Sequence, residues 1–152
     1  MARTGFIDHI GIGVPDLAAA KRYYDELMPI LGLTPWFPTA PDGSFNYGPD
    51  GAMGPQVFFY QAIEEGTNSR HRSGLQHIAF MVSSRAYVRE AHAWARAQGA
   101  EIIHEPRGFP EYGEHCYATY WLDPHGFMLE VACHADEEGA GEEGAGEEGS
   151  GE

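Results

Sequence analysis

The alternation of apolar and polar residues divides the first half of the chain into strands around one helix. Residues 6–14 alternate with the period of two that is typical of a half-buried strand. Apolar residues then recur at helical spacing from an N-cap at Asp16 to a stop at Gly32. Further strands are predicted at 33–37, near 45–47 and at 57–62.

The same order of elements returns in the second half of the chain. After a polar linker, a strand is predicted at 75–82, and a helix begins after Ser83 or Ser84 and ends at Gly99. The remaining strands are predicted at 100–105, 116–122 and 127–132, with a tight turn at 123–126. Each half therefore has the order β-α-β-β-β. We predict an α+β fold of two tandem modules, about 5–65 and 74–134, that form a cupped mixed sheet around a metal site.

Two histidines occupy the same position in the two modules. His9 lies in Asp-His-Ile-Gly-Ile-Gly-Val, and His77 lies in Gln-His-Ile-Ala-Phe-Met-Val, 68 residues later. Because side chains alternate across a strand, each histidine shares a face with small neighbours, which leaves room for a ligand. A third polar residue, Glu130, interrupts the apolar run 127–132. Such residues are costly within strands unless their polar atoms are satisfied. We therefore predict that all three converge on one metal ion.

The net charge of −14 is concentrated at the C-terminal end. Residues 136–152 contain eight acidic and no basic residues in Glu-Glu-Gly-Ala-Gly repeats, whereas residues 1–135 contain 15 acidic and 9 basic residues. We predict one two-module domain at 1–135 and a disordered acidic tail at 136–152. The chain has no basic stripe, so no nucleic-acid partner is expected.

The composition also bears on the compartment. The chain has no run of about 18 apolar residues, so no membrane partner is expected. The first five residues lack the apolar stretch of a signal peptide. Cys116 and Cys133 share no metal or redox spacing and are expected to be reduced core residues. These features favour a cytoplasmic protein.

The paired modules, the two histidine strands and the motif Asp-Pro-His-Gly-Phe-Met-Leu-Glu at 123–130 resemble the vicinal oxygen chelate superfamily. This superfamily includes glyoxalase I, bleomycin-resistance proteins and extradiol dioxygenases, and the resemblance covers about residues 5–134. It implies that His9, His77 and Glu130 bind a divalent metal ion (Fe, Mn, Zn or Ni). Two oxygen atoms of a small-molecule substrate would chelate this ion. It also implies a homodimer, because members commonly pair modules across subunits.

The fourth predicted strand departs from the glyoxalase-like members, which often carry a Glu ligand there. This chain has Pro-Gln-Val-Phe-Phe-Tyr-Gln at 55–61, in which Tyr60 or Gln61 is the residue that could reach inward. The departure favours a three-ligand site with open positions for water or substrate.

The C-terminal part is also similar to the extradiol dioxygenases. Their Gly-x-His, Tyr-x-x-Asp-Pro-x-Gly and ligand Glu match Gly-Glu-His at 113–115, the segment 120–126, and Glu130. The gap between His115 and Tyr120 is shorter than that pattern requires. The similarity implies that His115 and Tyr120 are catalytic residues that move a proton.

These features leave two functions open. The first is a metal-dependent enzyme, either a lyase, an isomerase or an extradiol-type dioxygenase, that acts on a small oxygen-chelating molecule. The alternative is a non-catalytic resistance protein that binds an antibiotic or another planar ligand. Its aromatic cup would be lined by Trp36, Phe37, Phe58, Tyr60 and Trp121. The intact ligand set favours the enzyme. The remaining histidines are expected at the surface (His92, His104 and His134) and in a turn (His125).

Overall fold

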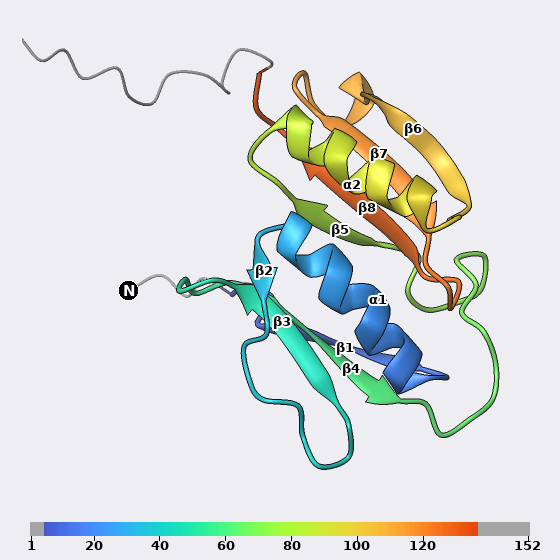
Figure 1. Cartoon of the computed structure of the whole chain (residues 1–152). Coiled ribbons are helices and arrows are strands. Elements are labelled where there is room, and N and C mark those ends of the chain that lie inside the picture. The colour runs from blue at the N-terminus through green and yellow to red at the C-terminus, as the bar shows by residue number, and fades with distance from the viewer. Residues whose placement is uncertain (1–4, 137–152) are drawn as a thin grey trace, which may run out of the picture.

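The computed structural model describes residues 5–136, so all but the first residue of the predicted acidic tail lies outside the described residues. The first module contains β1 (His9–Val14), α1 (Leu17–Ile30), β2 (Leu33–Thr34), β3 (Phe45–Pro49) and β4 (Gln56–Gln61) (Figure 1). The second contains β5 (Ile78–Met81), α2 (Arg85–Ala97), β6 (Ile102–Gly108), a 3₁₀ turn (Pro110–Tyr112), β7 (Tyr117–Leu122) and β8 (Met128–Cys133).

The two modules have the same sheet topology. The strand orders are β1-β4-β3-β2 and β5-β8-β7-β6, and in each sheet the first pair is parallel and the others are antiparallel. The predicted α+β fold of tandem modules is confirmed. The two sheets remain separate, and β1 and β5 lie at their edges.

Local signals explain the helix bounds. The Asp16 carboxylate accepts a hydrogen bond from Ala19 N at 2.8 Å, and Ser84 caps α2 through Tyr87 N. Gly32 and Gly99 end the helices at φ of +72° and +75°, a conformation that only glycine adopts at little cost. Neither helix within residues 5–136 is long and apolar enough to cross a membrane.

Four predicted strands have different bounds in the structure. β1 begins at His9 rather than at residue 6, and β5 spans Ile78–Met81 rather than 75–82, so His77 lies just before its strand. β2 ends at Thr34 rather than at residue 37, because Pro35 cannot donate to a ladder and Phe37 N donates to the Asn46 side chain instead. β6 continues to Gly108 rather than ending at residue 105. It accommodates Pro106 at a register shift on the sheet edge, where a missing N–H is tolerated.

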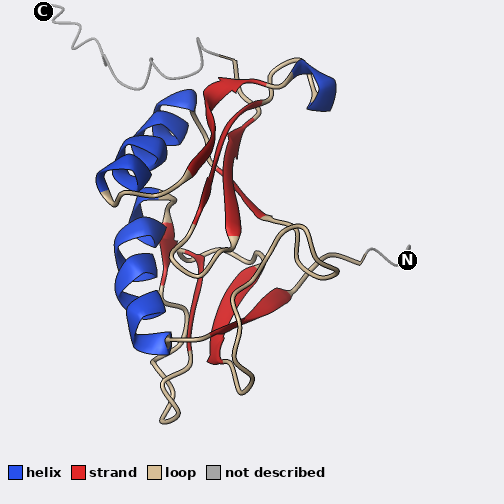
Figure 2. Ribbon diagram, turned by 90° about the vertical axis from the view of Figure 1, so that its right-hand side faces the viewer, coloured by secondary structure: helices blue, strands red, loops and turns tan. Residues whose placement is uncertain are grey.

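Both helices lie on the same side of the two sheets (Figure 2). A single apolar core runs beneath them through both modules and includes Tyr24, Phe59, Val88 and Leu129. A smaller cluster that includes Phe109, Cys116, Tyr120 and Met128 lies on the second sheet, separate from this core. The second sheet therefore has one face committed to helix packing and another face available for a site.

A buried hydrogen bond joins the modules. The Tyr24 hydroxyl in α1 donates to Asp123 Oδ2 at 2.7 Å, and Asp123 Oδ1 accepts the amides of His125 and Phe127 in the turn before β8. Burial raises the pKa of the Asp123 carboxyl, although these hydrogen bonds oppose the rise. Trp121 Nε1 also donates to the Tyr23 hydroxyl at 2.9 Å. α1 is thus attached to the strand ends that lead into β8.

Replacing Tyr24 by Phe tests this joint. We expect the free energy of unfolding to fall by about 1–3 kcal/mol, because a buried carboxylate oxygen loses its hydroxyl donor. Urea denaturation at neutral pH measures the change. The matched control is Tyr87→Phe on the exposed face of α2, which should change stability by less than about 0.5 kcal/mol. Equal losses in the two variants would contradict the role of this hydrogen bond.

Candidate functional site

A cavity of about 480 Å³ opens on the second sheet, on the face that α2 leaves uncovered. Its polar wall includes Arg70, Gln76, His77, His104, Tyr120 and Glu130. Strand alternation creates this wall. Leu129 and Val131 of β8 belong to the core beneath the helices, whereas Met128 and Glu130 line the cavity. We call it the His77 cavity.

His77 and Glu130 meet in this cavity. His77 Nε2 lies 3.1 Å from Glu130 Oε2, and the Glu130 side chain is about one-tenth exposed. Tyr120 is the cross-strand partner of Glu130, and its phenol lies close enough to the Glu130 carboxylate for that group to raise its pKa. The structure therefore brings together three of the five predicted site residues.

The hydrogen-bond partners of His77 define which nitrogen faces Glu130. Nδ1 contacts the side-chain oxygen of Gln76, an acceptor, which fits the tautomer with the hydrogen on Nδ1. Nε2 then presents its lone pair to a carboxylate oxygen, which is also an acceptor. Two acceptors at 3.1 Å require a cation, either a proton on Nε2 or a metal ion. Metal-bound histidines usually donate their other ring N–H in this way.

The separation also fits metal ligation. Two ligands at neighbouring corners of an ion, each about 2.1 Å from it, lie about 3 Å apart. His77 and Glu130 can therefore act as neighbouring ligands without rearrangement. Among residues 5–136, however, no group of three or more His, Cys, Asp or Glu side chains is placed to hold an ion.

His9 lies outside the wall of the His77 cavity. Its Nδ1 is 2.7 Å from Asp8 Oδ2, which again leaves Nε2 as the nitrogen available for a ligand. Its ring packs edge-on against Phe58 at 5.3 Å. Each predicted histidine thus receives an acceptor on Nδ1 from the preceding residue, but the two belong to different sheets.

The register shows how the modules have diverged. Ala79, two residues after His77, is paired with Glu130, whereas Gly11, two residues after His9, is paired with Phe58. Phe58 therefore stands where the second module has its carboxylate. By the same register, Asn46 stands in the place of Tyr120. The first module contains a histidine without the acid and the phenol that accompany it in the second.

His115 also lies outside this cavity wall. Its Nδ1 pairs with Asp136 at 2.5 Å, and nearly half of its side chain is exposed. Gln61, considered as an inward-facing residue, donates instead to Pro15 O at 2.8 Å, at the start of α1. Trp121, expected in an aromatic cup, is fully buried in the core. That expectation was wrong because the helices cover the face of β7 that carries Trp121.

Several cavity residues were not predicted from the sequence. They are Arg70, Gln76, His104, Phe109, Tyr112, Cys116 and His134. Met128 lies on the Glu130 face of β8 that strand alternation predicts, and Tyr120 was itself a predicted site residue. The linker residue Arg70 carries no periodic signal. Burial, assisted by the Glu130 charge, raises the pKa of the Cys116 thiol, so this cysteine stays protonated at neutral pH.

Tyr120 has a defined protonation state. Burial, together with its hydrogen bond to Glu130 and that residue's charge, raises the pKa of the Tyr120 phenol well above its usual range. Its hydroxyl therefore keeps its proton throughout the physiological pH range. Its ring packs edge-on against His77 and His104 at 6.1 and 5.4 Å. Tyr120 is a hydrogen-bond and proton donor at the cavity wall.

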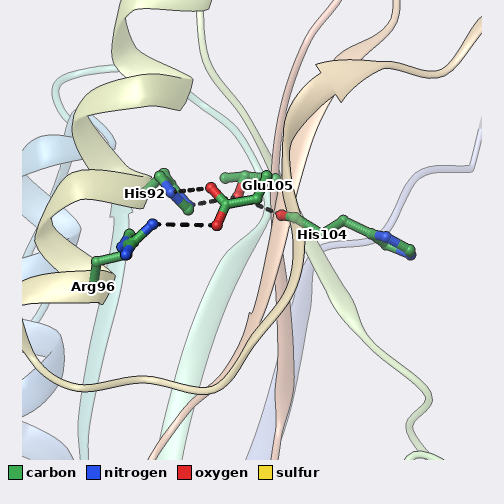
Figure 3. Close-up of polar contacts among 5 residues, drawn as sticks. His92, Arg96, His104 and Glu105 are labelled. Carbon is green, nitrogen blue, oxygen red and sulfur yellow. Dashed lines mark hydrogen bonds and ion pairs between the residues drawn. The ribbon is translucent and has the colours of Figure 1, made fainter.

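A polar cluster supports this wall from the helix side (Figure 3). His92 of α2, expected at the surface, is buried, and its Nε2 lies 2.7 Å from Glu105 Oε2. Its Nδ1 lies 3.2 Å from Thr119 Oγ1, and that hydroxyl donates to His104 O at 2.9 Å. Arg96 completes the cluster at 3.3 Å from Glu105. The expectation for His92 was wrong because Glu105 and Thr119 satisfy both ring nitrogens.

The cluster joins α2 to the second sheet. The Thr119 hydroxyl donates to His104 O, and the two ring nitrogens of His92 contact Thr119 Oγ1 and Glu105 Oε2. His92 therefore ties α2 to β6 and β7 next to His104 and Tyr120.

Comparisons with known proteins agree with this architecture. The model of the Glyoxalase/Bleomycin resistance protein/Dioxygenase superfamily matches residues 8–120, so the chain belongs to this superfamily. The predicted resemblance to the vicinal oxygen chelate proteins is confirmed. No curated protein shows significant similarity to the chain.

Solved structures share the fold. A candidate glyoxalase from Bacillus halodurans is 26% identical, with a TM-score of 0.70 over 85% of this chain and 96% of that chain. A glyoxalase/bleomycin resistance protein from Albidiferax ferrireducens T118 is 23% identical, with a TM-score of 0.65 over 85% and 98%. Lactoylglutathione lyase from Agrobacterium tumefaciens is 19% identical, with a TM-score of 0.60 over 87% and 96%. These last two likenesses concern the fold alone.

The polar cluster yields a stability prediction. Thr119→Val preserves shape but removes the acceptor for His92 and the donor for His104, so we expect a loss of about 1–3 kcal/mol in the free energy of unfolding. Thr39→Val, at an exposed position, is the control and should be nearly neutral. Guanidinium denaturation compares the two. A neutral Thr119→Val variant would show that the cluster does not stabilise the fold.

Proposed function

We propose that the protein is a metal-dependent enzyme that acts on a small molecule with two adjacent oxygen atoms. Its chemistry would be that of a lyase, an isomerase or an extradiol-type dioxygenase. The observation that carries the proposal is the His77–Glu130 pair, whose two acceptor atoms lie 3.1 Å apart at a cavity wall. Membership of the superfamily supports it.

We propose that His9 of a second copy of the chain completes the ligand set. His9 faces away from the core on an open sheet face, with Nε2 available, and lies outside its own chain's His77 cavity. The groove between the two modules is apolar, and Ile7 and Met81 on its wall are 62% and 76% exposed. Exposed apolar patches of this kind are typical of protein interfaces. These features support the predicted homodimer.

The residues have distinct roles in this proposal. His77, Glu130 and the second copy's His9 hold the ion, and other positions stay open for the substrate. When bound, a divalent ion stabilises negative charge on substrate oxygens as a Lewis acid. Tyr120 offers a protonated phenol to the reacting molecule, as a hydrogen-bond donor or in proton transfer. His115 remains a second, more distant candidate for proton transfer.

A non-catalytic binding role is the alternative. The stacked rings of Phe58 and Tyr60, with centroids 6.2 Å apart, favour it because they form a planar surface on the open face of the first sheet. Such a role would not require Tyr120. The cytoplasmic location stays a prediction, supported by the free thiols of Cys116 and Cys133.

Metal content tests the ligand set. His9→Ala and His77→Ala should each lose stoichiometric metal while retaining the wild-type circular dichroism spectrum, because both side chains lie on open faces. His71→Ala in the exposed linker is the control. Metal analysis by mass spectrometry of proteins purified without added metal gives the readout.

Mixing the two variants tests the second copy. Refolding His9→Ala with His77→Ala as an equal mixture should restore about a quarter of the wild-type metal content, because half of the dimers are mixed and each has one intact site. A site built within one chain would show no recovery. Light scattering that gives only a monomer would also contradict the proposal.

Turnover tests the role of Tyr120. With Fe(II)-loaded protein and a panel of catechols, Tyr120→Phe should lower kcat by about 10²–10⁴-fold and change substrate binding little. His115→Gln, made in parallel, measures whether His115 contributes. Oxygen uptake and a yellow ring-cleavage product report the dioxygenase reaction. Catechol binding to the metal without oxygen uptake would discard the dioxygenase version and leave a lyase, an isomerase or the binding role.

A further inference from the structure

Arg70, in the linker between β4 and β5, lines the His77 cavity. Its Nη1 lies 3.3 Å from the Sδ atom of Met128, and the residue is half-buried. A guanidinium has five N–H donors, whereas a thioether is a weak acceptor. Within residues 5–136, no carboxylate pairs with Arg70. In the described part of the chain, the Met128 sulfur is the one hydrogen-bond acceptor that the guanidinium contacts.

Docking of the linker does not require this guanidinium. The Asn68 side chain donates to Gly126 O at 3.4 Å, and Asn68 O lies 2.6 Å from where a Cβ atom at Gly126 would be. The backbones of Asn68 and Gly126 thus pack closely together, which holds the linker against the turn before β8. The linker is therefore held in place without the charge of Arg70.

The position of Arg70 relative to Glu130 defines a spacing. Met128 and Glu130 are two residues apart on one face of β8, which corresponds to about 7 Å along the strand. The guanidinium contacts one of these two wall positions and the His77–Glu130 pair occupies the other. Phe109, Tyr112 and Tyr120 supply apolar wall around that space. Arg70 is also the one permanently charged cation in the cavity wall of a chain whose net charge is −14.

We propose that Arg70 recognises a carboxylate on the substrate beside Met128, while the two chelating oxygens bind beside Glu130 on the same cavity wall. A planar carboxylate can accept two parallel hydrogen bonds from a guanidinium, which a neutral amide cannot match. The substrate class is then a small, ring-sized oxygen chelator with a carboxylate at its far end. The prediction of two chelating oxygens rests on the proposed function, whereas the prediction of a carboxylate rests on Arg70 alone.

The experiment uses two probes that differ in one group. Protocatechuate is a catechol with a ring carboxylate, and protocatechuamide is its neutral carboxamide. Isothermal titration calorimetry on Zn(II)-loaded full-length protein measures the affinity of each. We expect the carboxylate to bind at least about tenfold more tightly than the amide. Arg70→Gln should reduce this ratio to about one and leave amide affinity unchanged, because the amide does not use the charge.

Arg72→Gln is the matched control, since Arg72 is an exposed arginine of the same linker outside the cavity wall. It should retain the full carboxylate preference. A ratio near one in the wild type, an unchanged ratio in Arg70→Gln, an equal loss in Arg72→Gln, or no binding of either probe at millimolar concentration would overturn the proposal. Circular dichroism confirms that each variant is folded.

Repeating the titrations after metal removal separates the two proposals. If amide binding depends on metal but the carboxylate gives no Arg70-dependent gain, the anion proposal fails and the proposed function stands. If metal removal changes neither affinity but the Arg70-dependent preference persists, the metal-dependent function fails and carboxylate recognition stands.

Discussion

The structure depends on one constraint: each four-stranded sheet is covered by a helix on only one face. Strand side chains alternate, so every second residue must serve the core and the residues between them face away from it. In β8 this assigns Leu129 and Val131 to the helices, and Met128 and Glu130 to the cavity. In β7 it assigns Trp121 to the core and Tyr120 to the cavity. The polar site is therefore a consequence of how the core is packed.

On the open face of the second sheet, the Glu130 carboxylate is shielded from water and needs polar partners. Glu130 is nearly buried, and two polar groups face it, the Tyr120 hydroxyl and His77 Nε2. The phenol supplies a proton for hydrogen bonding, but the imidazole nitrogen supplies a lone pair if Gln76 holds the hydrogen on Nδ1. The unmet requirement is a positive charge between His77 and Glu130. This requirement makes the pair a candidate metal site even in a strongly acidic chain.

Signals close together in the sequence predicted much of the fold. The two helices with their caps at Asp16 and Ser84, and the repeat that relates His9 to His77, follow from local periodicity. Contacts between segments that are far apart in the sequence were harder to predict. Sequence alternation separated Tyr120 from Trp121, but only the helix position shows which one enters the core.

The wrong prediction for His92 and the omission of Arg70 have a similar origin. His92 is buried because Glu105 and Thr119, on two other strands, satisfy its ring nitrogens, and no pattern within α2 encodes those partners. Arg70 enters the cavity from an irregular linker, where periodicity carries no information about direction. Side chains whose place depends on tertiary partners are the ones that a single sequence leaves undetermined.

The divergence of the modules gives a physical reason for pairing unlike halves. The second module has two neighbouring candidate metal ligands, His77 and Glu130, and a protonated phenol. The first module has a histidine beside Phe58 and Asn46. Two first modules placed together would gather histidines and apolar rings without a carboxylate to balance the ion's charge. A first module placed against a second adds one neutral nitrogen to a pair that already contains the negative charge. Twofold symmetry produces that unlike contact twice in a dimer, so two equal sites arise from one interface. Loss of the acid in one module is therefore compatible with a complete site, provided that the modules meet across subunits.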